Sequence, residues 1–174
     1  MLSEIKLGGQ HRVNPEVVAV RMQTIRTLLE GYKSLSVTQL LKPLAQEFVH
    51  QVLPRSLCMP PRNRTEFARH AEGIFSIFRS FEMVPEAIYD DELRGVVIIH
   101  ARMEGILKST EDSWINECFL MVTLSPDHKE VVEISEFVDS AKAVEMKQRY
   151  APKDFGGVEE EQRKGRKRQR RLSW

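Results

Sequence analysis

The chain has 174 residues, of which 41% are hydrophobic and 29% charged, and this composition is typical of one globular domain with a short extension. No apolar run approaches the roughly 18 residues that cross a membrane, so no membrane partner is expected. The formal net charge of +1 divides into +4 for residues 151–174 and −3 for the rest, so nucleic-acid binding by the main body is not expected.

Residues 1–13 contain Gly8 and Gly9 and show no periodicity, which predicts a flexible arm. They lack a basic segment followed by an apolar one, so we expect no secretory signal. The two cysteines, Cys58 and Cys118, are then expected to be reduced thiols in the cytoplasm.

Two helices are predicted before the first strand. Asn14 and Pro15 are typical of an N-cap and a first helical position, and helical spacing of apolar residues follows. Gly31 is predicted to end this helix. Residues 36–42 predict a short second helix, which Pro43 closes.

The first strand is predicted over residues 48–53, and it carries two polar residues among apolar ones. Alternation places Phe48, His50 and Val52 on one face and Gln51 on the other. The strand ends at Pro54, before a loop that contains a double proline.

A third helix is predicted from Asn63, with an aromatic-rich apolar face that includes Phe67, Phe78 and Phe81. Extended segments are predicted over residues 82–89, 95–107, 113–124 and 130–137. Asp139 is predicted to cap a last helix over residues 141–150. Residues 151–174 predict a charged, disordered tail, whose basic run at 164–171 makes nuclear localisation a lesser alternative to the cytoplasm.

This order of elements favours an α+β fold over a wound parallel sheet. A curved sheet folded over helices leaves a cone-shaped cavity, which suits a small ligand.

Several short stretches, taken in order, resemble one protein family. They are His50-Gln51-Val52-Leu53-Pro54, Ser56-Leu57, Pro60-Pro61, His100-Ala101, Asn116-Glu117 and Glu136-Phe137-Val138-Asp139-Ser140. Their order and spacing resemble the SnoaL-like branch of the NTF2-like proteins, as found in fungal secondary-metabolite gene clusters. The resemblance spans about Asn14 to Tyr150, and it implies a curved mixed or antiparallel sheet wrapped around N-terminal helices.

The resemblance also implies a function. It implies a cofactor-independent isomerase or cyclase that acts on a polyketide, meroterpenoid or alkaloid intermediate, as a homodimer packed through the sheet. Two alternatives stay open: a dehydratase or hydrolase that uses the same cavity, and a non-catalytic module that binds a ligand or a protein.

His50 and Glu136 are the predicted catalytic pair. If the His50 face lines the cone, its imidazole can transfer protons near neutral pH. Glu136 shares a strand face with Ile134 and Val138, and apolar surroundings of this kind raise the pKa of a carboxyl group. The alternatives are a structural histidine and a glutamate in a salt bridge.

Six further residues are predicted to contact substrate: Arg55, Tyr89, Trp114, Asn116, Glu117 and Asp139. Alternation requires Asn116 and Glu117 to face opposite sides of the sheet, and Asp139 could instead serve only as a helix cap. The sequence has no His-rich metal motif, so no metal site is predicted. The polar residues at 100, 102 and 104 share one strand face, which predicts a solvated or dimer surface.

Overall fold

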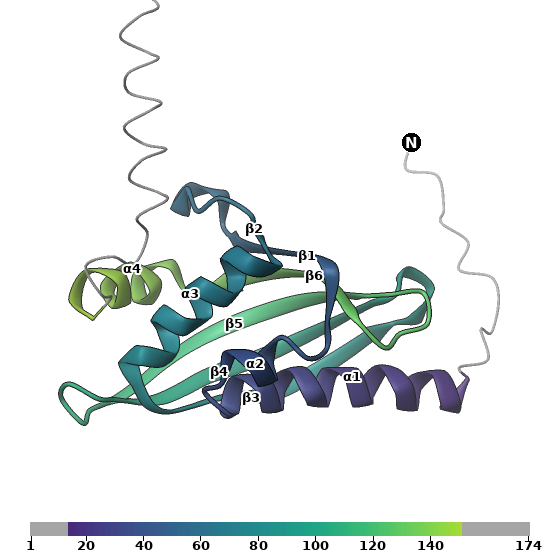
Figure 1. Ribbon diagram of the computed structural model, residues 1–174, viewed down its shortest axis with the longest axis horizontal. Coiled ribbons are helices and arrows are strands. Elements are labelled where there is room, and N and C mark those ends of the chain that lie inside the picture. Colours follow the sequence, from purple (N-terminus) through teal and green to yellow (C-terminus); the bar gives the residue numbers. More distant parts are fainter. Residues whose placement is uncertain (1–13, 151–174) are drawn as a thin grey trace, which may run out of the picture.

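The computed structural model describes residues 14–150, so the predicted arm and the charged tail lie outside the described residues (Figure 1). The elements follow in the order α1 (Pro15–Lys33), α2 (Val37–Leu40), β1 (Leu44–Leu53), η1 (Arg55–Leu57), β2 (Arg62–Asn63), α3 (Arg64–Ile77), β3 (Phe78–Asp91), η2 (Glu92–Arg94), β4 (Val96–Leu107), β5 (Ser113–Leu124), β6 (Val131–Val138) and α4 (Ser140–Arg149). Among the helices of this range, none combines the length and the apolar character that a membrane crossing requires.

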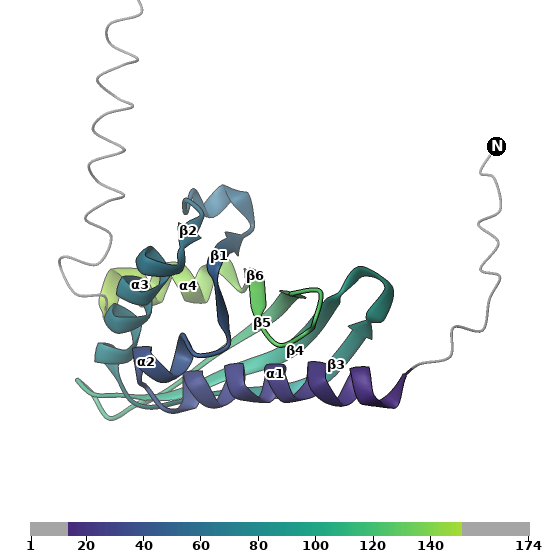
Figure 2. The same ribbon diagram turned by 45° about the vertical axis from the view of Figure 1, so that its right-hand side comes forward.

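The six strands form one sheet in the order β2-β1-β6-β5-β4-β3. Strand β1 runs parallel to β6, and every other neighbouring pair is antiparallel. The sheet is curved, α3 crosses its concave side, and α1 lies beside β3 (Figures 1 and 2). The predicted α+β class, with a mixed curved sheet around helices, is therefore confirmed.

The buried face of the sheet follows from the alternation of side chains along the central strands. In β5 the side chains of Asn116, Cys118, Leu120 and Val122 are buried, and the residues between them are exposed or half-buried. This inner face packs against the helices and forms the apolar core. The predicted Phe48, His50 and Val52 face of β1 also points inward.

Polar side chains fix the helix starts where the sequence predicts them. The Asn14 side chain accepts a hydrogen bond from the Glu16 backbone at 3.0 Å. Asn63 and Glu66 form a reciprocal capping box, with two side chain–backbone bonds of 2.9 Å each. This box sets the position at which α3 begins, and hence which of its residues reach the inner face.

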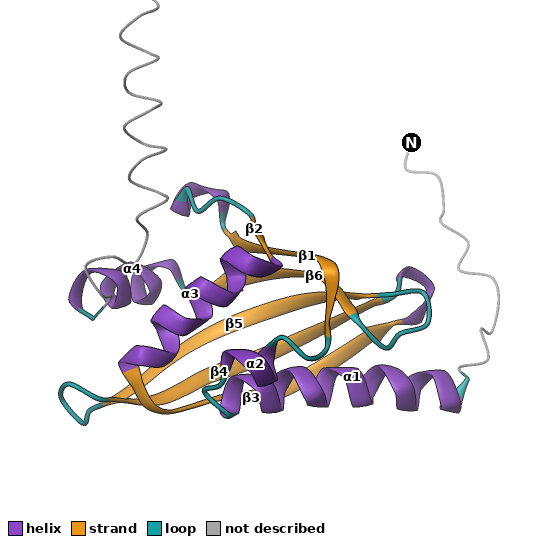
Figure 3. Cartoon of the chain, viewed as in Figure 1, coloured by secondary structure: helices purple, strands orange, loops and turns teal. Residues whose placement is uncertain are grey.

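The end of α3 differs from the prediction. The helix stops at Ile77, and Phe78 and Phe81 belong to β3, which is longer than the predicted segment 82–89 (Figure 3). The three-residue spacing of these aromatics imitates a helix, but Phe78 pairs with Leu107 of β4. Pairing between strands therefore decides this boundary.

Gly31 does not end α1, which continues to Lys33. A Cβ atom at Gly31 would lie 2.7 Å from the Cα atom of Leu40. Glycine is needed here because α1 and α2 approach closely, and not because the helix terminates. Helix α2 is also shorter than the predicted segment 36–42, and β1 begins earlier than predicted, at Leu44.

Candidate active site

The centre of the candidate site is a hydrogen-bonded pair on the inner face of β1 and β6. The Nε2 atom of His50 lies 3.2 Å from the Oε2 atom of Glu136. The pair forms because β1 and β6 are parallel neighbours, with His50 opposite Ile134 and Val52 opposite Glu136. The two side chains come from positions far apart in the sequence and meet across one strand boundary.

The two members of the pair differ in accessibility. The side chain of His50 is 1% exposed, and that of Glu136 is 12% exposed. The imidazole packs against the ring of Phe67, with 4.7 Å between ring centroids. Glu136 is therefore the member that an approaching molecule reaches first, and His50 is held in place behind it.

The second nitrogen of the His50 ring is unusual. Its Nδ1 atom is buried and has no hydrogen-bond partner within residues 14–150. A buried polar atom without a partner costs about 1–3 kcal/mol, so a structural histidine would normally be fully bonded. An atom of this kind is suited to exchange a proton with a bound molecule.

His70 of α3 lies beside the pair. Its ring is stacked over that of His50 with 6.1 Å between centroids. Burial, followed by the positive charge of Arg62, holds the pKa of His70 well below its ordinary value. His70 is therefore a neutral imidazole near neutral pH.

Tyr32 of α1 and Cys118 of β5 lie near enough to Glu136 for its charge to act on both groups. Burial raises the pKa of the Tyr32 phenol well above its ordinary value, and the charge of Glu136 adds to the effect. Burial and then Glu136 also raise the pKa of the Cys118 thiol. Both groups stay protonated, so Tyr32 is available as a hydrogen-bond donor and Cys118 is not a nucleophile.

Two of the predicted substrate contacts share the inner face with the pair. Asn116 is buried, and its Oδ1 atom accepts a hydrogen bond from the Glu117 backbone at 2.8 Å. Trp114 packs against Phe78, with 5.4 Å between ring centroids, and its indole N–H is buried without a partner in the described chain. Both precede Leu120, the residue opposite Glu136, and lie nearer the start of β5, so they line a more distant part of the interior.

The other four predicted contacts lie elsewhere. Tyr89 and Glu117 are exposed on the outer face of the sheet, where their partners are Ile98 and Arg102. The Asp139 carboxylate caps α4 and accepts from the Ala141 backbone at 2.9 Å. Arg55 is exposed in η1, after the end of β1. The structure therefore does not bring Tyr89 or Glu117 to the pair, and Asp139 is accounted for by its capping bonds.

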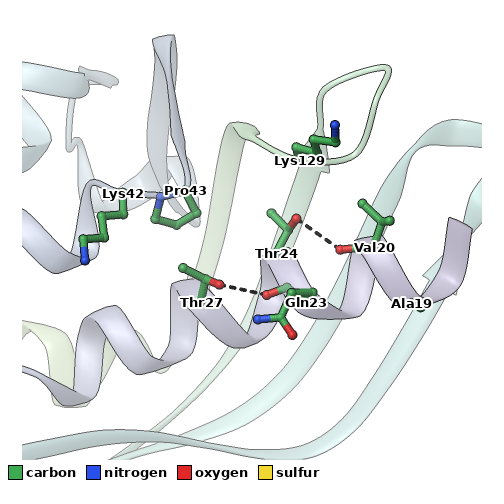
Figure 4. A pocket seen from close by; sticks show the side chains of 8 residues that line it. All are labelled: Ala19, Val20, Gln23, Thr24, Thr27, Lys42, Pro43 and Lys129. Atoms are coloured by element: carbon green, nitrogen blue, oxygen red, sulfur yellow. Dashed lines mark hydrogen bonds between the residues drawn. The ribbon is translucent and has the colours of Figure 1, made fainter. Parts of the chain in front are cut away.

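A shallow hollow of about 510 Å³ lies outside this site, over α1 (Figure 4). It is lined by Ala19, Val20, Gln23, Thr24, Thr27, Lys42, Pro43 and Lys129. The hydroxyls of Thr24 and Thr27 already donate to backbone carbonyls, that of Thr24 to His128 at 2.7 Å and that of Thr27 to its own helix at 3.0 Å. The two lysines lie on different sides of the hollow (Figure 4). This lining offers no acid and base that converge on one point.

Sequence reasoning missed Tyr32 and His70. Both lie on the apolar faces of their helices, where Tyr32 follows Leu28 by four residues and His70 follows Phe67 by three. A tyrosine in such a stripe resembles core. The sequence offered one indication of a site residue on α3, because His70 interrupts an otherwise apolar helix face.

The fold and this interior define a class: a small α+β protein with an NTF2-like fold and a buried His–Glu pair. No protein-family model matches the chain. In solved structures, the chain superposes on BvnE pinacolase from Penicillium brevicompactum with a TM-score of 0.72 and 17% identity, covering 81% of this chain and 97% of that one. A Catenulispora acidiphila protein described as having a ketosteroid isomerase-like fold gives a TM-score of 0.56 at 10% identity, covering 75% and 90%.

Curated sequences give a related result. The chain is 25% identical over 142 residues to a protein named monooxygenase AgnL5 from Paecilomyces divaricatus, covering 82% of this chain and 84% of that protein. These comparisons confirm the NTF2-like fold and the expected resemblance to fungal proteins that share it.

Proposed function

We propose that the chain is a small-molecule enzyme of fungal secondary metabolism, in which His50 and Glu136 transfer protons to and from a substrate bound on the inner face of the sheet. The observation that carries the proposal is the 3.2 Å pair whose other imidazole nitrogen, Nδ1, is buried without a hydrogen-bond partner among residues 14–150. The names of the similar proteins, a pinacolase and a monooxygenase, also support an enzyme.

The geometry favours an isomerase or cyclase. The pair shares one proton between His50 Nε2 and Glu136 Oε2. It can accept a second proton from the substrate at His50 Nδ1 and return the first proton to the substrate from the Glu136 carboxyl group. Such a transfer moves a proton between two atoms of the same substrate and leaves the substrate's composition unchanged. Tyr32, which stays protonated, can donate a hydrogen bond to an oxygen that becomes negative during the transfer.

The substrate class is proposed from the lining. Apolar side chains such as Phe67, Leu120 and Ile134 surround the pair, and the polar groups among them are few. This combination suits a largely apolar carbocyclic molecule that carries carbonyl or hydroxyl groups, as polyketide, meroterpenoid and alkaloid intermediates do. The apolar walls would hold it in one reactive conformation. The chemistry proposed for the pair uses no cofactor.

The mass of the product tests the reaction type. The chain would be incubated with the metabolite that accumulates when its gene is deleted, and the product would be analysed by mass spectrometry. An isomer of unchanged mass is expected. Loss or gain of water would select the dehydratase or hydrolase alternative, and gain of one oxygen atom would select the reaction that the name of the curated relative suggests. A metabolite left unchanged, but bound, would favour a ligand-binding module.

A further inference from the structure

The outer face of the sheet, away from the His50–Glu136 pair, carries a second cluster of chemically capable side chains. The cluster joins Glu86 of β3, His100 of β4 and Glu117 of β5, whose ligand atoms all lie within 4.8 Å of one another. His100 Nε2 is 2.6 Å from a Glu117 carboxylate oxygen, and His100 Nδ1 is 3.7 Å from a Glu86 carboxylate oxygen. We propose that these three residues form a binding site for a divalent transition-metal cation of the zinc type.

The sheet holds the three side chains in position. His100 pairs with Phe119 of β5, and the two rings are stacked at 4.6 Å with an angle of 9° between their planes. Glu86 is the unpaired residue at a register shift of β3, between Pro85 and Ala87. A bulge of this kind redirects a side chain, and here it brings Glu86 toward His100.

A fourth residue orients one of the ligands. Arg102 Nε lies 3.3 Å from Glu86 Oε1, while Glu86 Oε2 is the oxygen that faces His100. Arg102 therefore holds Oε1 of Glu86 in place and leaves Oε2 available to a cation. Hydrogen-bonding residues around metal sites commonly orient the ligands in this way. Arg102 is also bonded to Glu104, at 3.0 Å.

The charges match a divalent ion. The carboxylates of Glu86, Glu104 and Glu117 carry three negative charges, and Arg102 neutralises one of them. A histidine that binds a metal must be neutral, and the local charge of the metal-binding form is then −2. The three ligands come from three different strands and are brought together by strand pairing. They therefore form no short metal-binding motif in the sequence.

The donor set selects the type of cation. One imidazole and two carboxylates suit zinc and its neighbours among the transition metals, whereas magnesium and calcium prefer oxygen ligands alone. Ligand atoms around tetrahedral zinc lie roughly 3.3 Å apart, given metal–ligand distances of about 2.0–2.2 Å. A single ion can bind only one of the two ring nitrogens of His100. One ligand atom from each residue already lies within 4.8 Å of the other two, so side-chain rotations would bring the three atoms to this spacing.

Titration of the metal-free full-length chain with zinc chloride, followed by calorimetry, tests the proposal. One saturable site per chain is expected, and His100→Gln and Glu117→Gln are each expected to weaken it at least tenfold. Glu133→Gln is the matched control, because Glu133 is an exposed carboxylate of the outer face, which within residues 14–150 accepts a hydrogen bond from the Ser135 hydroxyl at 3.0 Å and lies outside the cluster. The affinity of Glu133→Gln for zinc should equal that of the wild type.

A second readout guards against a variant that folds poorly. Zinc should raise the midpoint of thermal unfolding of the wild type and of Glu133→Gln equally, and that of Glu117→Gln, whose side chain is 63% exposed, by less at the same zinc concentration. No saturable binding by the wild type would overturn the proposal. So would binding that is unchanged in both His100→Gln and Glu117→Gln, since the ion would then lie elsewhere.

Discussion

The buried guanidinium of Arg21 gives a stability prediction with a defined order of effects. Arg21 of α1 is fully buried, and its Nε atom donates to Asp90 Oδ1 at 2.8 Å. Its remaining donors reach the Val96 carbonyl at 3.2 Å and His128 Nδ1, also at 3.2 Å. One charge therefore ties α1 to the β3–β4 connection and to the β5–β6 turn.

Asp90→Ala should be the most damaging single change in this network. It removes the carboxylate that pairs directly with the buried positive charge of Arg21, which costs about 3–5 kcal/mol. For a domain of this size, that loss corresponds to about 6–20 °C in the midpoint of thermal unfolding. Arg21→Met should cost less, about 1–2 kcal/mol, because it removes the charge itself and leaves Asp90, 22% exposed, in contact with water.

Urea unfolding at neutral pH, followed by circular dichroism, measures both variants. Glu82→Gln serves as the control, because it breaks an exposed ion pair with Lys33 (2.9 Å, side chains 48% and 54% exposed) and should leave stability close to that of wild type. Equal losses for Asp90→Ala and Arg21→Met, or a larger loss for Arg21→Met, would refute this reasoning.

Three further experiments have defined outcomes. Gly31→Ala should destabilise the fold by about 1–3 kcal/mol, although alanine favours helices, because its Cβ would meet the Leu40 backbone; thermal unfolding measures this. A thiol reagent at mildly alkaline pH should modify exposed Cys58 in the native chain and reach Cys118 only after denaturation, because burial raises the pKa of the Cys118 thiol; mass spectrometry of the labelled peptides decides. We propose that the chain dimerises through the outer sheet face, which would place the cluster at His100 within the interface, so Phe119→Glu should convert a dimer into a monomer in sedimentation velocity.

Each of these outcomes has a clear opposite. A stabilised Gly31→Ala variant would mean that α1 and α2 can separate without cost. Rapid labelling of Cys118 in the native chain would mean that the interior near Glu136 opens freely. A monomeric wild-type chain, or a dimer that survives Phe119→Glu, would remove the outer face as the dimer surface.

The strand faces were predictable from sequence because alternation along a strand has a fixed period of two. Phe48, His50 and Val52 were placed together on this basis, and β1 bears that out. Alternation also assigned Asn116 and Glu117 to opposite faces, which the structure confirms. It could not say which face of each strand is the inner one, because that depends on where the helices pack.

Apart from the pairing of His50 with Glu136, contacts between distant segments could not be predicted. Gly31 has a conventional place near the end of a helix, and only the approach of Leu40 reveals its role. Tyr32 and His70 look like members of apolar stripes until the fold turns them toward His50 and Glu136. The cluster around His100 likewise depends on the register of three strands and on a bulge in β3.

A double-mutant cycle on turnover tests the central claim, that His50 and Glu136 act together on a bound substrate. With the isolated pathway intermediate, His50→Ala and Glu136→Gln should each lower kcat by roughly a hundredfold or more. Because the two groups share one proton-transfer step, the double variant should be little slower than the slower single variant. Rates near wild type in both single variants, in chains whose circular dichroism is unchanged, would contradict the account.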